Sequence, residues 1–317
     1  LITFALKDMS FLREDKRLES EIAVAREEIG TLELKLEKLK DRNISYSIAK
    51  VYFDDNDKTV ESFRSCLNER TKLIVCTHAS NVFGTRLPVE RICALAHEYG
   101  ILFCLDAAQS AGVIEINIGE NNYDFVCCPG HKGLYGPMGI GLLLINTEKL
   151  PDTLIEGGTG SLSEERNQPA FTPDRYESGT MNIPGIIGLQ KGIEFVEHTG
   201  VEKIYKNEMT HINTLKGLLY KNKNIIIYPQ KNGSTYCLPL LSISVVDTSS
   251  EVVAKYLNDK YGIAVRAGLH CAPLAHEFMN TISNGTVRIS PSYFTSDKEI
   301  FILANALNNF KKTTQFN

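Results

Sequence analysis

Two short apolar segments, each followed by a charged side chain, constrain the fold of this chain more than any other feature. Residues 101–106 (ILFCLD) and 123–128 (YDFVCC) have the apolar pattern of buried strands and are too short to span a membrane. The first ends at Asp106, and the second leads through Pro-Gly to Lys132. Ligands of parallel sheets bind beyond the carboxyl ends of the strands. We therefore expect this acid and this lysine to face one site.

A glycine-rich segment, residues 133–145 (GLYGPMGIGLLLI), follows Lys132 and predicts a tight turn before another strand. Removal from water in such a turn favours the neutral, nucleophilic form of a lysine amine. Taken singly, a strand-end aspartate more often caps a turn, and a lysine near glycines is more often solvated. Together, Asp106 and Lys132 suit pyridoxal phosphate, which bonds to a lysine as a Schiff base and needs an acid at its pyridine nitrogen.

The sequence around these two residues favours the cofactor hypothesis. DAAQSAG (106–112) and GHKGLYGPMGIG (130–141) resemble the fold-type I, class V aminotransferase superfamily, and within it the cysteine desulfurases and selenocysteine lyases. The resemblance continues through 77–85, 155–186, 265–276 and 285–300, and so covers nearly everything from about Thr71 onward. It implies an α/β fold with a mostly parallel central sheet, helices on both faces, and a smaller α+β C-terminal domain. Buried apolar strands alternating with helical patterns from Lys72 onward predict the same architecture.

The resemblance also implies how the cofactor is held. Lys132 would be the Schiff-base lysine, and Asp106 would pair with the pyridinium. Four further contacts are implied within the chain and one across a dimer: Ala108 on the ring face, Gln109 and Asn81 at the ring hydroxyl, His131 at the phosphate, and Thr180 at the phosphate of a neighbouring subunit.

Two positions depart from the family pattern. Pro129 stands where the family often has Ser or Thr, and it supplies no hydroxyl for a phosphate contact. Asp8 falls where a histidine usually stacks on the cofactor ring, and a carboxylate cannot stack in that way. These departures motivate the hypothesis of a non-catalytic relative that keeps the fold.

Cys271 is the one cysteine of eight that lies outside an apolar strand or helix pattern. The loop 265–276 (VRAGLHCAPLAH) places Arg266 and His270 beside it, and positive neighbours favour the reactive thiolate. By resemblance, Cys271 attacks the substrate sulfur, while Arg288 clamps the substrate carboxylate, with Asn81, Arg266 and His270 also at the substrate. A metal site in this loop lacks a fourth ligand nearby, so we expect no metal.

These residues imply a pyridoxal phosphate-dependent cysteine desulfurase. The substrate would be L-cysteine, the product L-alanine, and the sulfur would remain on Cys271 as a persulfide for an acceptor protein. The alternatives are a selenocysteine lyase, another class V lyase or aminotransferase, and the non-catalytic relative. We expect a homodimer, because Thr180 would act across subunits.

Composition excludes several other classes. A net charge of -4 and a pI near 6.0 give no basic surface for nucleic acid, and no apolar run approaches the roughly 20 residues of a membrane helix. Scattered cysteines without a C-x-x-C pair predict reduced thiols in a cytoplasmic protein. The length and a composition change at 221–236 predict two domains, 1–205 and 206–317. Since the chain starts within a strand-like LITFAL, we expect a longer protein whose preceding segment carries the family's phosphate-binding turn.

A heptad pattern predicts a long helix over residues 13–43. A protruding helix or helical hairpin that docks a partner, and an amphipathic helix lying on its own domain, are both compatible with it, and we favour packing within the homodimer. The apolar positions of the heptad are Leu18, Ile22, Ala25, Ile29, Leu32, Leu36 and Leu39.

Overall fold

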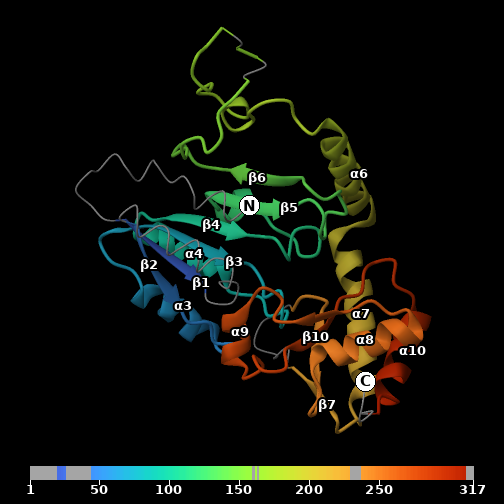
Figure 1. Cartoon of the computed structure of the whole chain (residues 1–317). Coiled ribbons are helices and arrows are strands. Elements are labelled where there is room, and N and C mark those ends of the chain that lie inside the picture. Colours follow the sequence, from blue (N-terminus) through green and yellow to red (C-terminus); the bar gives the residue numbers. More distant parts are fainter. Residues whose placement is uncertain (1–19, 26–43, 159–160, 163, 229–236, 312–317) are drawn as a thin grey trace.

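The computed structural model describes residues 20–25, 44–158, 161–162, 164–228 and 237–311 of the 317. These residues form two sheets, and helices α6 (Ile183–Thr199) and α7 (Val201–Leu219) run as a column beside them (Figure 1). Among the described residues, no helix is both long and apolar enough to cross a membrane.

The first sheet has six described strands in the order β2-β1-β3-β4-β5-β6, and every neighbouring pair is parallel except β5 and β6. This confirms the predicted α/β architecture with a mostly parallel sheet. The strands are β1 (Ser20–Ala25), β2 (Ile44–Ala49), β3 (Thr71–Thr77), β4 (Leu102–Asp106), β5 (Phe125–Pro129) and β6 (Gly141–Ile145). The helices joined to them are α3 (Asn56–Ser65), α4 (Val89–Glu98) and α5 (Ile118–Asn121), and the short 3₁₀ helix η3 (Asp174–Tyr176) lies in the segment after β6.

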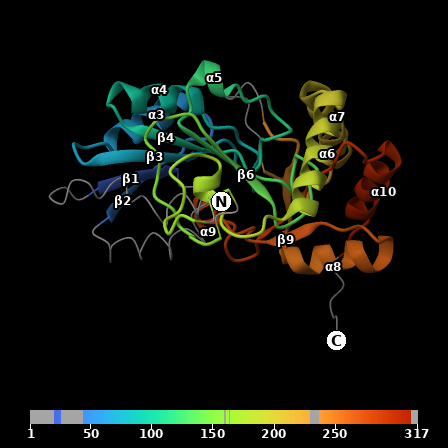
Figure 2. The same cartoon turned by 90° about the horizontal axis from the view of Figure 1, so that it is seen from above.

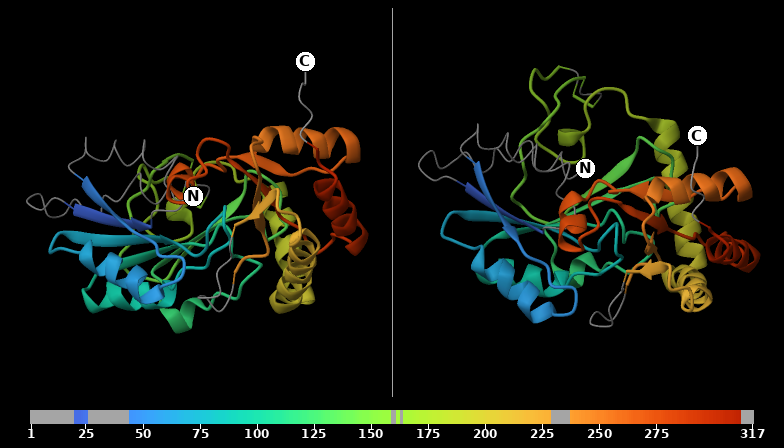
Figure 3. Two further views of the ribbon diagram at one scale, coloured as in Figure 1. Left: turned by 90° about the horizontal axis from the view of Figure 1, so that it is seen from below. Right: turned by 60° about the horizontal axis from the view of Figure 1, so that its bottom comes forward.

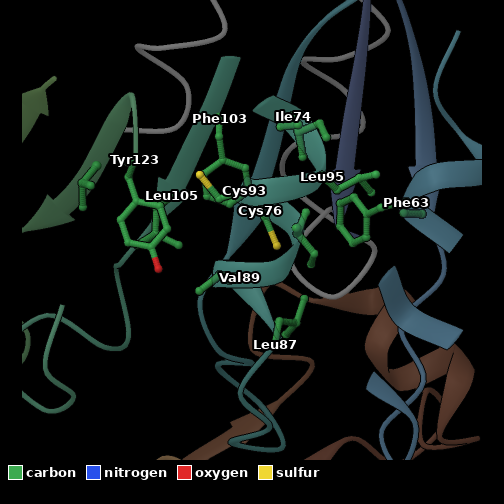
Figure 4. Close-up of a cluster of buried hydrophobic side chains, with 14 of the residues drawn as sticks. Phe63, Ile74, Cys76, Leu87, Val89, Cys93, Leu95, Phe103, Leu105 and Tyr123 are labelled. Carbon is green, nitrogen blue, oxygen red and sulfur yellow. The ribbon is translucent and has the colours of Figure 1, made fainter. Parts of the chain in front are cut away.

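Side chains of β3 and β4 alternate between two buried clusters, one on each face of the sheet. Ile74 and Phe103 pack against α3 and α4, which with α5 cover one face (Figures 2 and 4). Leu73 and Leu102 lie in the cluster on the other face, where Leu274 of α9 (Pro273–Phe278) packs. Because both faces are buried, each strand is a continuous apolar run, which is why these strands could be predicted from short segments.

The helix predicted over residues 13–43 is wrong at residues 20–25. These residues form β1, which pairs in parallel with β2 on one side and with β3 on the other. SEIAVA is apolar enough for either structure, and the two neighbouring strands supply partners for its backbone N–H and C=O groups. The rest of the heptad, and Asp8, lie outside the described residues. A helical seam through Ile22 is therefore excluded.

The second sheet has the order β7-β8-β10-β9 with antiparallel neighbours. Helices α8 and α10 lie beside it and share a buried cluster with α7 (Figure 3). The predicted domain boundary at 205–206 falls within α7 and stays a prediction. The remaining elements are β7 (Ile225–Ile227), β8 (Leu241–Val245), α8 (Ser250–Tyr261), β9 (Arg266–Gly268), β10 (Thr286–Ile289) and α10 (Asp297–Asn308).

Candidate active site

The carboxyl ends of β3, β4 and β5 meet at one edge of the first sheet. Asp106 ends β4, pairs in register with Cys127 of β5, and is only 2% exposed. Its Oδ1 accepts a 2.9 Å hydrogen bond from the backbone N–H of Ala108, which closes the turn that carries Gln109. Lys132 lies three residues beyond the end of β5. The fold therefore brings the acid and the lysine to the same edge, as expected for parallel strands.

Glycines hold the Lys132 turn between the Gln109 turn and α6. Gly112 has φ 80°, and a Cβ at this position would lie 2.0 Å from the backbone oxygen of Gly133. A Cβ at Gly192 of α6 would lie 2.1 Å from the backbone oxygen of Leu134. Real Cβ atoms cannot approach backbone oxygens so closely. The glycines thus permit the Gln109 turn and α6 to pack tightly against the backbone that follows Lys132.

A cavity of about 420 Å³ opens at this edge, and both sheets contribute to its walls. The first part of the chain supplies Asn81, Gln109 and Lys132. The second supplies Arg266, His270, Cys271 and Arg288.

Four predicted cofactor residues do not line this cavity. Asp106 and Ala108 lie in the turn that supports Gln109, and His131 is exposed beside Lys132. Thr180 is exposed in the segment that precedes α6, and its contribution to a neighbouring subunit stays a prediction.

Tyr135 and Glu208 are among the cavity residues that the sequence analysis did not identify as site residues. The signal for Glu208 was its position on the buried face of α7, where it stands one turn from both Ile204 and Ile212. A charged residue on an apolar helix face is unusual and often functional. Tyr135 gave no comparable signal, since it lies in the glycine-rich segment.

Hydrogen bonds between distant residues join the two walls of the cavity. Arg288 donates from Nη1 to the backbone oxygen of Asn81 at 2.8 Å, and Asn81 donates from Nδ2 to the backbone oxygen of His270 at 2.8 Å. Two buried polar atoms of these residues, Asn81 Oδ1 and Arg288 Nε, have no hydrogen-bond partner. Buried polar groups are nearly always paired, so these two atoms indicate a site built for a polar ligand.

Arg266 and Arg288 stand directly opposite each other on β9 and β10. Like charges in this position destabilise a sheet. Burial, followed by the charge of Arg266, lowers the pKa of Arg288. An anion bound in the cavity would offset this repulsion, so the pair favours a negatively charged ligand.

Cys271 is exposed, and Arg266 Nη2 lies 3.6 Å from its Sγ. His270 and Cys271 both adopt left-handed backbone conformations, with φ 52° and 62°. Such conformations are strained for non-glycine residues, and the bond from Asn81 to the His270 oxygen helps to hold this one. Cys271 is thereby presented at the cavity by a constrained turn.

The expected contribution of His270 to the Cys271 thiolate needs correction. Burial, followed by the charge of Arg288, lowers the pKa of His270 to about 3, so its ring is neutral near pH 7. Its Nε2 lies 3.1 Å from the backbone oxygen of Thr286, which can only accept, so Nε2 carries the proton. Of the two predicted positive neighbours, Arg266 is the one that carries a charge. Nδ1 of His270 is a further buried atom without a hydrogen-bond partner.

A second cysteine lies near a histidine and an acid, but it lacks the features of a nucleophile. Cys93 Sγ is 3.9 Å from His97 Nε2, and the same nitrogen is 2.9 Å from Asp124 Oδ2. Burial raises the pKa of Cys93 to about 12. Asp124 also accepts from the backbone N–H of Phe103. This group therefore supports β4 and is not a reactive site.

The residues around Lys132 fit pyridoxal phosphate. A lysine and a buried aspartate lie at or just beyond adjacent strand ends, Gln109 lines the cavity together with Lys132, and three residues of the cavity wall, Asn81, His270 and Arg288, have buried polar atoms without a hydrogen-bond partner. Within the described residues, no three His, Cys, Asp or Glu side chains are grouped so that they could hold a metal ion.

Comparisons with known proteins agree with this geometry. A probable cysteine desulfurase of Methanothermobacter thermautotrophicus is 32% identical over 277 residues, which are 85% of this chain and 68% of that relative. A probable cysteine desulfurase of Pyrococcus abyssi is 35% identical over 250 residues, 76% of this chain and 60% of that relative. The chain spans 37% of a longer relative from Mycolicibacterium paratuberculosis.

A solved structure and a family model also match this chain. An apo cysteine desulfurase from Thermococcus onnurineus matches with a TM-score of 0.84 and 28% identity, over 97% of this chain and 76% of that chain. This match confirms the fold-type I prediction. Residues 10–303 match the family model for class-V aminotransferases. The chain therefore belongs to the aminotransferase class-V family, whose members depend on pyridoxal phosphate.

Proposed function

We propose that this chain is a cysteine desulfurase that uses pyridoxal phosphate, converts L-cysteine to L-alanine and leaves the sulfur on Cys271 as a persulfide. The observation that carries the proposal is a single cavity lined by Lys132, Cys271 and the opposed arginines Arg266 and Arg288. An amine, a thiol and an anion site are the groups that this reaction requires. The names of the relatives support the same assignment.

Lys132 would hold the cofactor, with Asp106 at the pyridine nitrogen, Ala108 on the ring, Gln109 and Asn81 at the ring hydroxyl, and His131 at the phosphate. When bound, pyridoxal phosphate supplies an electron sink for the carbon atom next to the substrate amine. The amine of Lys132 would move the proton at the substrate Cα. Its turn is packed at Gly112 and Gly192, which restrains the backbone from which the lysine side chain extends.

Arg288 would bind the substrate carboxylate. Its planar guanidinium can make two parallel bonds to a carboxylate, and its unpartnered Nε faces a site that also holds the unpartnered Oδ1 of Asn81. A bound carboxylate would also reduce the repulsion between Arg266 and Arg288. The negative charge of the substrate would therefore balance the positive charges of the two arginines.

Cys271 would take the sulfur. Its thiolate attacks the substrate sulfur, an S–S bond forms, the C–S bond breaks, and the bonding electron pair goes to the substrate carbon. Cysteine and the enzyme thiol thus become alanine and the enzyme persulfide, with no external oxidant or reductant. Arg266, 3.6 Å from Cys271 Sγ, would stabilise the attacking thiolate. His270, neutral and bonded to Thr286, would hold the turn and contribute to the substrate wall.

The proposal includes a homodimer and a sulfur acceptor. Exposed apolar side chains Met181, Ile183 and Ile187 stand beside Thr180 at the start of α6, which supports a second copy of the chain there. Because Cys271 is exposed, a persulfide on it could be reached by an acceptor. The cysteines are free thiols, in keeping with the predicted cytoplasmic location.

Purified protein incubated with cysteine tests the proposal. We expect alanine release at a rate well above that of free pyridoxal phosphate, and a sulfur adduct on Cys271 detected by mass spectrometry. The visible absorbance of the lysine-bound cofactor should disappear in Lys132→Ala. A wild-type protein that binds no pyridoxal phosphate would overturn the proposal.

A further inference from the structure

Glu208 is a buried acid on the cavity wall that the proposed reaction does not use. It belongs to α7, lines the cavity and is 5% exposed. Burial raises its pKa to about 7, against the opposing effect of the hydrogen bond from Tyr135. Burying a carboxyl group costs free energy unless hydrogen bonds compensate for the lost contact with water.

Tyr135, the hydrogen-bond partner of Glu208, is the far end of the Lys132 turn. Its backbone N–H donates to the backbone oxygen of Lys132 at 2.9 Å, and its φ of 54° is left-handed. Its hydroxyl donates to Glu208 Oε1 at 3.3 Å, across 73 residues of sequence. The ring also packs edge-on against Phe195 and Phe294, with centroids 5.0 and 5.9 Å away. A strained residue is thus held at its side chain by groups from other elements.

Tyr293 and Phe294 belong to the segment that follows Arg288. The ring of Phe294 packs edge-on against Tyr135, and the ring of Phe195 packs against both Tyr293 and Phe294. Tyr293 lies four residues after the end of β10, the strand that carries Arg288, and residues 290–292 between them line the cavity. Tyr135, whose hydroxyl is bonded to Glu208, therefore sits where the Lys132 turn and the segment after Arg288 meet.

We propose that Glu208 is a positioning residue that, through the hydrogen bond it accepts from Tyr135, fixes the Lys132 turn relative to the segment that follows Arg288. The inference rests on the proposed function, since it assigns Glu208 a part in that reaction. A carboxyl oxygen of Glu208 accepts the bond from the Tyr135 hydroxyl. Glutamine keeps one acceptor oxygen, and alanine keeps none.

The test compares Glu208→Ala, Glu208→Gln, Tyr135→Phe and the double variant Glu208→Ala with Tyr135→Phe. Glu202→Gln is the matched control, because Glu202 lies on the same helix but is exposed and paired with Lys206. Two quantities are measured on the full chain: amide hydrogen exchange of residues 132–136 in cofactor-free protein, and kcat and KM for cysteine in cofactor-loaded protein.

We expect Glu208→Ala and Tyr135→Phe each to accelerate exchange of residues 132–136 while β3 and β4 keep wild-type protection. Each should lower kcat about tenfold with KM changed by less than about twofold, because the lost hydrogen bond positions the lysine and does not bind substrate. Glu208→Gln should recover part of kcat. The double variant should be no slower than the slower single variant, because both changes break one link. The control should match wild type.

Unchanged exchange at residues 132–136 would overturn the proposal, and so would multiplicative losses in the double variant. A general loss of protection with kcat unchanged would show a purely structural role and would also overturn it. If Glu208→Ala does not fold, the nearly isosteric Glu208→Gln and Tyr135→Phe carry the test. If wild type releases no alanine from cysteine, the proposed function fails, while the exchange measurement still decides whether Glu208 holds the Lys132 turn.

Discussion

Arg288 Nη1 donates a 2.8 Å hydrogen bond to the backbone oxygen of Asn81, which lies 207 residues earlier in the chain. The bond joins the loop after β3 to strand β10, and so joins the wall with Lys132 to the wall with Cys271. The residue proposed to bind the substrate carboxylate therefore also closes the cavity. Substitutions at this position should affect substrate binding before they affect folding.

Arg288→Lys should weaken cysteine binding although it preserves the positive charge. An ammonium group cannot make two parallel bonds to a carboxylate, and the loss of one charged hydrogen bond costs about 1.5 to 3 kcal/mol. We expect kcat/KM to fall by roughly ten- to a hundredfold, mainly through KM. Steady-state kinetics with cysteine provide the measurement. The control is Lys191→Gln, an exposed cation on α6. An unchanged KM would assign the carboxylate to another residue.

Cys271→Ala should retain the cofactor absorbance and lose sulfur transfer. The thiol is exposed and contacts Arg266, so its removal leaves the Lys132 wall intact. We expect alanine release from cysteine to fall by a factor on the order of a hundred or more, because no other nucleophile takes the sulfur. Cys66→Ala, at a half-buried cysteine of α3's C-cap, serves as the control. Full alanine release by Cys271→Ala would contradict the desulfurase assignment and favour a selenocysteine lyase.

Gly112→Ala should displace the Lys132 turn. The new Cβ would lie 2.0 Å from the backbone oxygen of Gly133, and φ at this position is 80°. We expect the free energy of unfolding to fall by about 2 to 4 kcal/mol, the sum of overpacking and backbone strain, together with weaker cofactor binding. Denaturant unfolding and pyridoxal phosphate titration measure the two effects.

Gly139→Ala is the matched control for that substitution. Gly139 has φ 81°, but its Cβ would meet nothing within 4 Å. Gly139→Ala should lower the free energy of unfolding by only about 1 kcal/mol, from backbone strain alone. Equal losses for the two glycines would show that the contact with Gly133 is unimportant.

His78 should make the fold acid-sensitive. Burial, followed by the charge of Arg86, lowers its pKa from 6.5 to about 3, and the ring is 1% exposed between Ser110 and Arg86. Between these pH values the unfolded chain binds a proton that the folded chain does not. The stability contribution of His78 is therefore complete above about pH 6.5 and is lost as the pH falls toward 3.

His78→Asn removes this titration while its amide can still reach Ser110. The difference in unfolding free energy between wild type and His78→Asn should shrink by about 1.4 kcal/mol for each pH unit below about 6. Denaturant titrations at several pH values measure it, and groups that titrate equally in both proteins cancel. A difference that stays constant with pH would contradict a neutral buried ring.

The local sequence was sufficient to predict those elements whose structure is determined by the residues of a single segment. The strands that deliver Asp106 and precede Lys132 could be predicted because strands buried on both faces are short apolar runs. The tight turn in the glycine-rich segment 133–145 could be predicted because glycine allows conformations and approaches that other residues do not. Motif resemblance then identified Cys271 and Arg288 as candidates, and the cavity contains both.

Tertiary structure decided what depends on neighbours distant in sequence. Residues 20–25 follow a heptad pattern, yet they are a strand because β2 and β3 provide backbone partners on both sides. His270 is neutral because the fold buries it near Arg288. Glu208 meets Tyr135 only because α7 passes the Lys132 turn. A sequence determines the chemistry that each side chain can perform and its local periodicity, whereas hydrogen-bond partners, burial and therefore charge are set by which segments the fold brings together.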